Sequence, residues 1–543
     1  MIRASRSVAR MGRGGSPRAR GVSLLFIAAA LTACAALPTP PSNVIDHPPD
    51  ANAPARAGGP LPGLTAPQLE LFNDSIHAFT EIDTVTGEGD TSKGLGPRFN
   101  LNSCSGCHAF PAVGGSSGFV NPEPIVAKLN GARNDAEIPF LRVDGPIVEA
   151  RFKSLMDSRG NFLTDARGKR RADGGVHALF TIAGRTDAVG CEIAQPPFVQ
   201  AWNRDNIGLR IPTPVFGLGL VEAISDSTIA ANSLEFMQAV AGASRVRNGQ
   251  ALDYGRSYSN VAEARGRIAM YRKLGIVGRP GRGRENRSGN DGSITRFGWK
   301  AQNKSLLLFS GEAYNVEQGV TNELFPNERD AEAIPLSDEC KGNATPEDDT
   351  KFDQTDAQRI ATDRSPVAAF AAVASDLVKF ELFMRMLAPP QPACDLAQSS
   401  SCPQNIVRGS EVFDKVKCSA CHVPKLRVGE SSITAITAQQ YARLYSDLLL
   451  HKMGRCPPRS DHSPRCLADE ISQGEAKEDE FRTAPLWGVG QRIFFLHDGR
   501  ARDLPTAILA HKGPGSEANA VIRLYEQLPN SSRQDLIDFL RSL

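Results

Sequence analysis

The spacing of apolar and polar positions predicts one long helix near the middle of the chain. From Ser365 to Leu387 apolar side chains return every three or four residues, and two prolines follow shortly after. This spacing places the apolar residues on one face of an α-helix, and proline ends such a helix. Upstream, residues 278–290 have the Gly, Pro, Arg and Asn content of an exposed loop. We expect an N-terminal region with inserted loops that ends in this helix, then a linker over residues 389–403.

Two more helices are expected at the end of the chain, over residues 518–527 and 533–543. Ser531 or Ser532 would be the N-cap of the last one.

A short segment of the first half returns in the second half. Residues 214–219 read Pro-Val-Phe-Gly-Leu-Gly, and residues 485–490 read Pro-Leu-Trp-Gly-Val-Gly. An arginine, Arg210 or Arg482, stands shortly before each copy. This repeated segment indicates that the two halves of the chain are related.

The N-terminus has the composition of an export signal. Residues 1–33 contain six arginines and no acidic residue, and an apolar run from Val22 to Ala30 is too short to span a bilayer of about 30 Å. Cys34 follows Leu-Thr-Ala, which resembles a bacterial lipobox and implies lipidation. We expect residues 1–33 to be a signal peptide, residues 34–65 to be a lipidated Pro/Ala-rich tether, and the protein to face the periplasm from the outer membrane.

The charge of the exported chain gives no reason to expect a nucleic-acid partner. Removing six positive charges from a formal net charge of +2 leaves about −4. No basic patch interleaved with aromatic residues contradicts this.

Two pentapeptides carry the candidate chemistry. Cys104-Ser-Gly-Cys107-His108 and Cys418-Ser-Ala-Cys421-His422 have the attachment sequence of a c-type haem, in which two thiols bond to the porphyrin and the histidine binds iron. A redox dithiol or a zinc half-site would explain one copy, but two copies in an exported chain favour two covalently bound haems.

The flanks of the two pentapeptides also agree. A phenylalanine, Phe99 or Phe413, stands five residues before each, and a proline, Pro111 or Pro424, follows within three residues. Each copy is therefore expected at the front of one cytochrome-c-like unit.

Six cysteines remain once the lipid and the haems have taken five of the eleven. An even remainder in an oxidising compartment indicates disulfides, and six cysteines permit fifteen pairings. The close pairs Cys394 with Cys402 and Cys456 with Cys466 are the first expectation, which leaves Cys191 with Cys340.

His511 is a candidate sixth iron ligand. Asp503 is a suitable N-cap, Pro505 suits the first turn and Gly513 would stop a short apolar helix that carries His511 on its last turn. A core histidine without a ligand role is the alternative. The other histidines of the exported chain outside the pentapeptides are His47, His77, His177, His451, His462 and His497.

Residues 496–501 (Leu-His-Asp-Gly-Arg-Ala), followed by the helix to His511, resemble the C-terminal signature of the bacterial dihaem cytochrome c peroxidase and MauG superfamily. Within it, residues 94–115, 296–302, 445–451 and 482–488 are similar to the dihaem oxidoreductase family, also labelled thiol oxidoreductase-like. The resemblance spans nearly all of residues 94–543. It implies a mainly α fold with two cytochrome-c-like haem domains, residues 66–388 with loop-rich insertions and residues 405–543.

The resemblance implies that the second haem carries electrons and takes its sixth ligand from the helix after the His-Asp-Gly turn. That helix offers His511, so we expect bis-histidine ligation by His422 and His511, with His451 and Met453 as fallback candidates. Histidine would lower the reduction potential relative to methionine.

The first haem is then expected to be the reactive one, with His108 below the iron and an open site above. Peroxide chemistry needs a base near iron, and we expect this base to be Glu222, with Phe216 and Arg210 shaping the pocket. Trp299 and Trp487 are candidate electron relays, although packing is the commoner role of a tryptophan.

The leading hypothesis is a peroxidase-like dihaem oxidoreductase that reduces peroxide with electrons from a small redox protein or a quinol-linked donor. An electron-transfer cytochrome with two six-coordinate haems is the first alternative, and it needs His177 or Met156 over the first haem. A MauG-type oxygenase or protein-modifying enzyme is another. Calcium between the domains and the oligomeric state stay open.

Overall fold

The structure is a computed structural model. It describes residues 43–50, 52–83, 94–129, 138–173, 176–177, 180–181, 195–242, 252–253, 257–258, 261–282, 293–327, 346–351, 354–362, 366–455 and 466–543. The chain divides into residues 1–36 and 37–543, and all described residues belong to the second unit. Within this part of the chain, every helix is too short or too polar to span a lipid bilayer.

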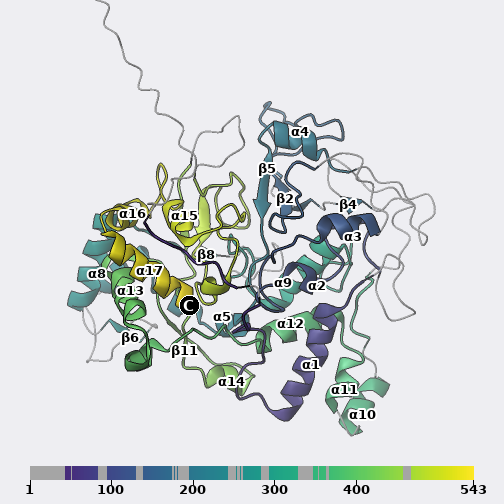
Figure 1. The fold of residues 1–543 in the computed structure, drawn as a ribbon. Coiled ribbons are helices and arrows are strands. Elements are labelled where there is room, and N and C mark those ends of the chain that lie inside the picture. Colours follow the sequence, from purple (N-terminus) through teal and green to yellow (C-terminus); the bar gives the residue numbers. More distant parts are fainter. Residues whose placement is uncertain are drawn as a thin grey trace, which may run out of the picture. The chain divides into compact units, whose positions relative to one another are not determined.

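The described residues form a mainly α structure, as expected (Figure 1). The helices before residue 390 are α1 (Ala66–Thr80), α2 (Cys104–Cys107), α3 (Glu123–Leu129), α4 (Phe198–Asn203), α5 (Leu218–Glu222), α6 (Asp226–Ala230), α7 (Leu234–Gly242), α8 (Val261–Leu274), α9 (Leu306–Ala313), the π-helix η1 (Tyr314–Gln318), α10 (Gln354–Thr362), α11 (Pro366–Ala371) and α12 (Asp376–Met386). The later ones are η3 (Leu396–Ser401), α13 (Gln404–Lys415), η4 (Cys418–Ala420), α14 (Thr434–Thr437), η5 (Val489–Gln491), α15 (Leu504–Leu509), α16 (Asn519–Glu526) and α17 (Asn530–Ser542).

The strands are short and antiparallel. The largest sheet described has the order β3 (Val176–His177), β2 (Glu149–Phe152), β5 (Ile207–Arg210). The two-stranded pairs are β1 (Arg98–Phe99) with β4 (Phe180–Thr181), β6 (Leu252–Asp253) with β7 (Ser257–Tyr258), β8 (Gly281–Arg282) with β9 (Ile294–Thr295), β10 (Leu426–Arg427) with β11 (Tyr441–Ala442), and β12 (Leu450–Lys452) with β13 (Glu480–Arg482).

Each pentapeptide lies beside a packed pair of helices. In the first half α1 packs against α12, and in the second half α13 packs against α17, where Figure 1 shows the two helices side by side. In α13 the side chains of Ile406, Val412 and Phe413 are buried, which is the apolar stripe of an amphipathic helix. The largest core cluster combines residues of both halves, from Leu61 to Trp487, so the halves share a core.

The two similar segments, residues 214–219 and 485–490, have the same backbone arrangement. Gly217 and Gly488 both have a left-handed backbone, with φ of 68° and 71°, which glycine adopts without steric cost. Two residues later, a Cβ on Gly219 or on Gly490 would lie 2.1 Å from a backbone carbonyl near the end of α12 or of α17. Because Gly219 and Gly490 have no side chain, α12 can pack closely against residues 214–219, and α17 can pack in the same way against residues 485–490.

The aromatic counterpart of Phe413 is not Phe99. Phe413 lies against the His422 ring, with ring centres 6.5 Å apart, and in the first half the ring next to His108 is that of Phe79, at 6.1 Å. Phe99 belongs to β1 and to another core cluster. Equal spacing in the sequence does not give Phe99 and Phe413 equivalent positions, because in the first half the ring next to His108 comes from α1, which is more distant in the chain.

The helix expected from Ser365 to Leu387 is divided into α11 and α12. Ser375 is the N-cap of α12, and its hydroxyl accepts a hydrogen bond from the Val378 amide. A serine in this position starts a new helix because it satisfies an amide that has no partner inside the helix.

The helix ends of the last region also differ from expectation. The last helix begins at Asn530 with Pro529 as N-cap, so Ser531 and Ser532 lie inside its first turn. The cap of α15 was predicted correctly, because the Asp503 carboxylate accepts from the Thr506 amide at 2.7 Å.

The described part of the expected tether lies against the protein. The Ile45 amide donates to Gln534 at 2.8 Å, Asp46 forms an ion pair with Arg541, and Leu61 is buried. Residues 43–65, apart from residue 51, are therefore not a free spacer, because α1, α12 and α17 provide partners for them. Cys34 lies outside the described residues.

One of the expected disulfides lies within the described residues. Cys394 and Cys402 are bonded, with Cα atoms 5.5 Å apart. Cys466 is also disulfide-bonded, while Cys456, Cys191 and Cys340 lie outside the described residues. The four pentapeptide cysteines form no disulfide.

Replacing Gly409 by alanine tests the helix packing of the second half. The added Cβ would lie 2.0 Å from the Asp535 carbonyl oxygen, so we expect a loss of about 1–3 kcal/mol from overpacking, measured by chemical denaturation. In the control, Gly266→Ala in α8, nothing lies within 4 Å of the new Cβ, and we expect a gain of roughly 0.5–1 kcal/mol. Equal stability of the two variants would contradict this account of the α13–α17 contact.

Candidate haem sites

His422 and His511 face each other across a cavity beside the second pentapeptide. Their ring centres are 6.5 Å apart. Metal–imidazole bonds are about 2 Å long and a ring centre lies about 1.1 Å behind its nitrogen, so two imidazoles on one iron have centres about 6 Å apart. The observed spacing therefore fits bis-histidine ligation. His511 follows α15 by two residues and does not lie within its last turn.

The outer nitrogen of each of these rings is fixed by a backbone carbonyl. His422 Nδ1 donates to the Tyr445 oxygen at 3.0 Å, and His511 Nδ1 donates to the Ala507 oxygen at 2.8 Å. Such a bond sets the tautomer and leaves Nε2 as the metal ligand. Burial lowers the pKa of both rings, to about 4 for His422, and a neutral imidazole is the form that binds metal.

The walls of the second cavity fit a haem. Most of the lining is apolar and includes Phe413, Leu504, Ala507 and Ile522, together with Cys418 and Cys421. Two buried arginines, Arg482 and Arg492, also line it, and Arg492 Nε and Nη2 have no hydrogen-bond partner among the described residues. An unpartnered buried guanidinium suits a carboxylate such as a haem propionate.

Both ring nitrogens of the fallback ligand His451 are hydrogen-bonded to carboxylates. Its Nε2 lies 3.0 Å from Asp447 Oδ2 and its Nδ1 lies 2.8 Å from Glu517 Oε2, so neither nitrogen is available for iron. Met453 lies in the cavity wall with Leu467 and Phe481.

The first pentapeptide also borders a cavity. His108 Nδ1 donates to the Gly115 oxygen at 3.0 Å, as His422 does to Tyr445. Burial lowers the pKa of His108 to about 4, and hydrogen bonds to Gly115 and Thr213 and the charge of Glu149 act in the opposite direction. Cys104, Cys107 and His108 line this cavity together, so the residues present fit a covalently bound haem with His108 as its axial ligand.

The first cavity is rich in acidic groups, unlike the second. Its carboxylic residues are Glu123, Glu149, Glu312 and Glu317. Burial, helped by Glu149, raises the pKa of Glu317 to about 8, and burial raises that of Glu123 to about 8. The Glu149 carboxylate forms an ion pair with Arg151 at 3.0 Å. Charged and neutral carboxyl groups therefore stand side by side near His108.

Glu222, the expected base, lies elsewhere. Its Oε1 accepts from the Leu306 amide at 2.9 Å, which caps α9, and its Oε2 accepts from Arg385 at 2.6 Å. It does not line the first cavity. Of its two expected companions in the pocket, Arg210 lines the cavity and Phe216 belongs to the shared core.

Trp299 lines both cavities. Its indole N–H donates to the Ile211 oxygen at 3.0 Å, and its ring lies 6.4 Å from that of His497. Trp487 packs in the shared core against Gly217 and lines neither cavity. The structure therefore places one of the two tryptophans between the haem sites.

Of the two ligands that the electron-transfer alternative requires, one is described, and it does not lie over His108. Met156 is buried in another core cluster and does not line the first cavity, and the side chain of His177 lies outside the described residues. Met384 does line the cavity, but it belongs to α12, the helix that packs on the His108 side through the Phe79–Phe383 contact.

Glu149 and Glu317 were missed by the sequence reasoning. Residues 149–152, Glu-Ala-Arg-Phe, alternate between charged and apolar, which predicts a strand with Glu149 and Arg151 on one face. That signal could have identified the pair. Glu317 lies in a π-helix, and nothing in its flanking sequence indicates that helix.

Within the part of the chain that the structure describes, no cluster of acidic side chains forms a calcium site. Among the described residues the one group of three ligand-type side chains is Cys421, Asp447 and His451, and its cysteine belongs to the haem motif.

Comparison with known proteins finds a family match in the second half of the chain. Residues 285–543, slightly less than half of the chain, match the family described as "Di-haem oxidoreductase, putative peroxidase". No curated protein sequence matches.

Similar solved structures include hydrazine synthase from Kuenenia stuttgartiensis, with 17% identity over 32% of this chain and 58% of that chain and a TM-score of 0.18. They also include the diheme peroxidase BthA from Burkholderia thailandensis, with 15% identity over 46% of this chain and 65% of that chain and a TM-score of 0.26. The chain thus spans less than two thirds of either protein. Residues 285–543, which contain the second haem motif and His511, are thus similar to the di-haem oxidoreductase family.

Proposed function

We propose that this protein is a peroxidase-type dihaem enzyme that reduces hydrogen peroxide at the first haem site and transfers electrons to it from the second. The observation that carries the proposal is the difference between the two cavities. The second has two imidazoles at the spacing of an iron pair, whereas the described lining of the first contains one imidazole, that of His108. A haem with a vacant sixth position is open to a small oxidant, and one with two protein ligands serves electron transfer.

The haems would supply the iron chemistry and the two electrons, one from each haem, and carboxyl groups of the chain would deliver the two protons, which are replaced from solvent. Reducing one hydrogen peroxide to two waters takes two electrons and two protons. Glu149 is the carboxylate whose charge acts on His108, and Arg151 holds it in the cavity. We assign it the role of acid–base group. Glu317, whose raised pKa keeps it protonated near neutral pH, is a proton source beside it.

Trp299 is proposed as the electron relay between the sites, because it lines both cavities. Trp299→Phe keeps an aromatic ring of smaller size and removes the hydrogen bond to Ile211. We expect transfer between the haems to slow by roughly tenfold, a barrier change of about 1.4 kcal/mol, measured by stopped-flow oxidation of the second haem after peroxide addition. Trp487→Phe, which alters a core residue, is the control. An equal rate in the wild type and Trp299→Phe would remove the relay role.

The donor is proposed to be a small redox protein or a quinol-linked carrier, and the protein is proposed to be a lipid-anchored protein that faces the periplasm. The support is the export-type segment before Cys34 and the acidic net charge that remains without it.

The direct test of the function is a titration of the fully reduced protein with hydrogen peroxide. We expect one equivalent of peroxide to remove two electrons, so that the reduced bands of both haems disappear together at a ratio of one peroxide per chain. Oxidation that requires many equivalents, or that stops after one haem, would contradict the proposed reaction.

A further inference from the structure

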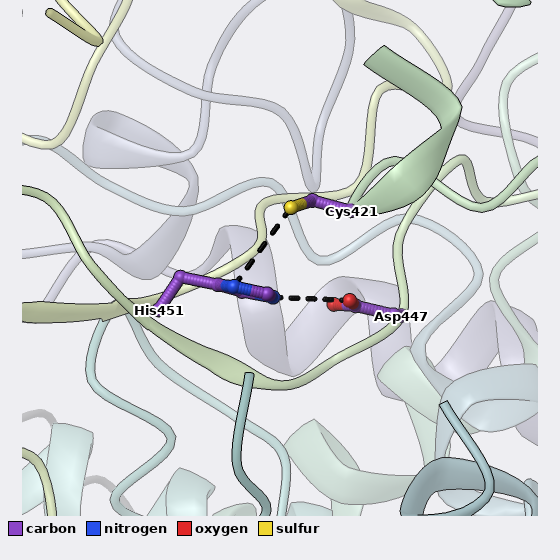
Figure 2. Close-up of side chains that lie close together, drawn as sticks. All are labelled: Cys421, Asp447 and His451. Carbon is purple, nitrogen blue, oxygen red and sulfur yellow. Dashed lines mark hydrogen bonds and ion pairs between the residues drawn. The ribbon is translucent and has the colours of Figure 1, made fainter. Parts of the chain in front are cut away.

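His451 is held between two carboxylates. Figure 2 shows it with Asp447 and Cys421, and its second carboxylate partner is Glu517. Nε2 lies 3.0 Å from Asp447 and Nδ1 lies 2.8 Å from Glu517. A carboxylate can only accept, so both ring nitrogens donate, and an imidazole that donates at both nitrogens carries a positive charge.

The two carboxylates are held by the backbone as well. Asp447 is fully buried and accepts from the Leu449 amide at 3.0 Å. Glu517 accepts from the amides of Val277, Gly278 and Lys452 at 2.8, 3.1 and 3.1 Å. Backbone donors favour the charged form of a carboxyl group. The three side chains, which we call the His451 triad (Asp447, His451 and Glu517), therefore carry a formal net charge of −1.

The triad lies at the point where the second haem is attached. His451 Nδ1 is 3.8 Å from the Cys421 sulfur, and the Asp447 amide donates to the Cys421 carbonyl at 2.9 Å. Cys421, Asp447 and His451 have ligand atoms close enough to hold a metal ion. However, the haem thioether would use the Cys421 sulfur, so we assign the cluster a different role.

We propose that the His451 triad sets the reduction potential of the second haem by fixing a net charge of −1 at its Cys421 edge. A negative charge buried near iron stabilises the ferric state, and the effect is large where water is excluded. The inference deepens the proposed function and depends on haem being bound at the second pentapeptide. His451 acts here as a positioning residue, because its ring nitrogens bond to Asp447 and Glu517. Arg482, a cation that lines the cavity and interacts with Asp447, donates to the Gly298 carbonyl and is the same in every variant below.

The test is the midpoint potential of the low-spin haem in His451→Gln. Removing the imidazolium changes the triad from −1 to −2, so we expect the equilibrium constant for reduction to fall at least tenfold, which is about 59 mV for one electron. His451→Lys keeps the cation and should shift the constant by less than about threefold, or roughly 28 mV. Potentiometry followed by visible spectroscopy reports this haem separately from the high-spin one.

A double variant separates charge from structure. His451→Gln with Asp447→Asn restores a net charge of −1, so its potential should return toward that of the wild type. An unchanged or raised potential in His451→Gln, or a double variant that shifts further than the single one, would overturn the proposal. So would loss of the second haem from His451→Gln, measured by pyridine haemochrome, because it would show a structural role. Absence of this haem from the wild-type chain would instead mean that the proposed function fails.

Discussion

His511→Ala is expected to abolish the low-spin signal of the second haem. His511 is the imidazole opposite His422, and alanine leaves the iron with one protein ligand. The ferric haem should then become high-spin, so that electron paramagnetic resonance shows two high-spin haems instead of one of each kind. Haem content should stay unchanged, because Cys418 and Cys421 are intact.

A companion variant, His511→Met, supplies a ligand of another type. It should keep the second haem low-spin and raise its midpoint potential by ~100 mV or more, a part of the range of about 0.8 V that axial ligands span. His77→Ala, at an exposed histidine of α1, is the control and should change neither signal. A low-spin signal that persists in His511→Ala would show that another residue is the sixth ligand.

Glu149→Gln is expected to lower the rate of the reaction with peroxide by about 10²–10⁴-fold, the usual contribution of a positioned acid–base group. This corresponds to a barrier increase of roughly 3–5 kcal/mol. The amide keeps the size of the side chain and cannot take up a proton, while the ion pair with Arg151 is lost. Stopped-flow absorbance of the first haem measures the rate, and the spectra before mixing should equal those of the wild type.

The matched control is Glu222→Gln, at the acid that the sequence favoured. Its carboxylate caps α9 and pairs with Arg385, so its loss should reduce stability by about 1–3 kcal/mol and change the peroxide rate by less than about threefold. If Glu222→Gln were slow and Glu149→Gln were not, the assignment of the base would have to be reversed.

The candidate haem-attachment residues could be identified from sequence because the chemistry of such a motif is local. Two thiols and an imidazole must lie within one turn of chain, and Cys104, Cys107 and His108 do so whatever surrounds them. The position of His511 after a short helix could be predicted for a related reason, since the Asp503 cap and Pro505 define the start of that helix in the sequence itself. The helix ends two residues earlier than His511, but the turn that follows still places the ring opposite His422.

The cavity walls could not be predicted because they come from segments far apart in the chain. The partners of Glu222 are 84 and 163 residues away from it, and no local pattern shows that Leu306 and Arg385 will occupy its carboxylate. The position of Trp299 could not be predicted for the same reason. The two cavities that it lines are built from segments far apart in the chain. The break at Ser375 is different, since serine followed by aspartate is a helix-start signal that apolar periodicity alone overlooks.

The central claim is that the chain carries two haems with different coordination, one open over His108 and one closed by His422 and His511. Electron paramagnetic resonance of the ferric protein, with pyridine haemochrome to count the haems, tests this most directly. We predict two covalent haems per chain, one giving a high-spin signal and the other a low-spin bis-histidine signal of equal intensity. Two low-spin signals, or a single haem per chain, would contradict the account.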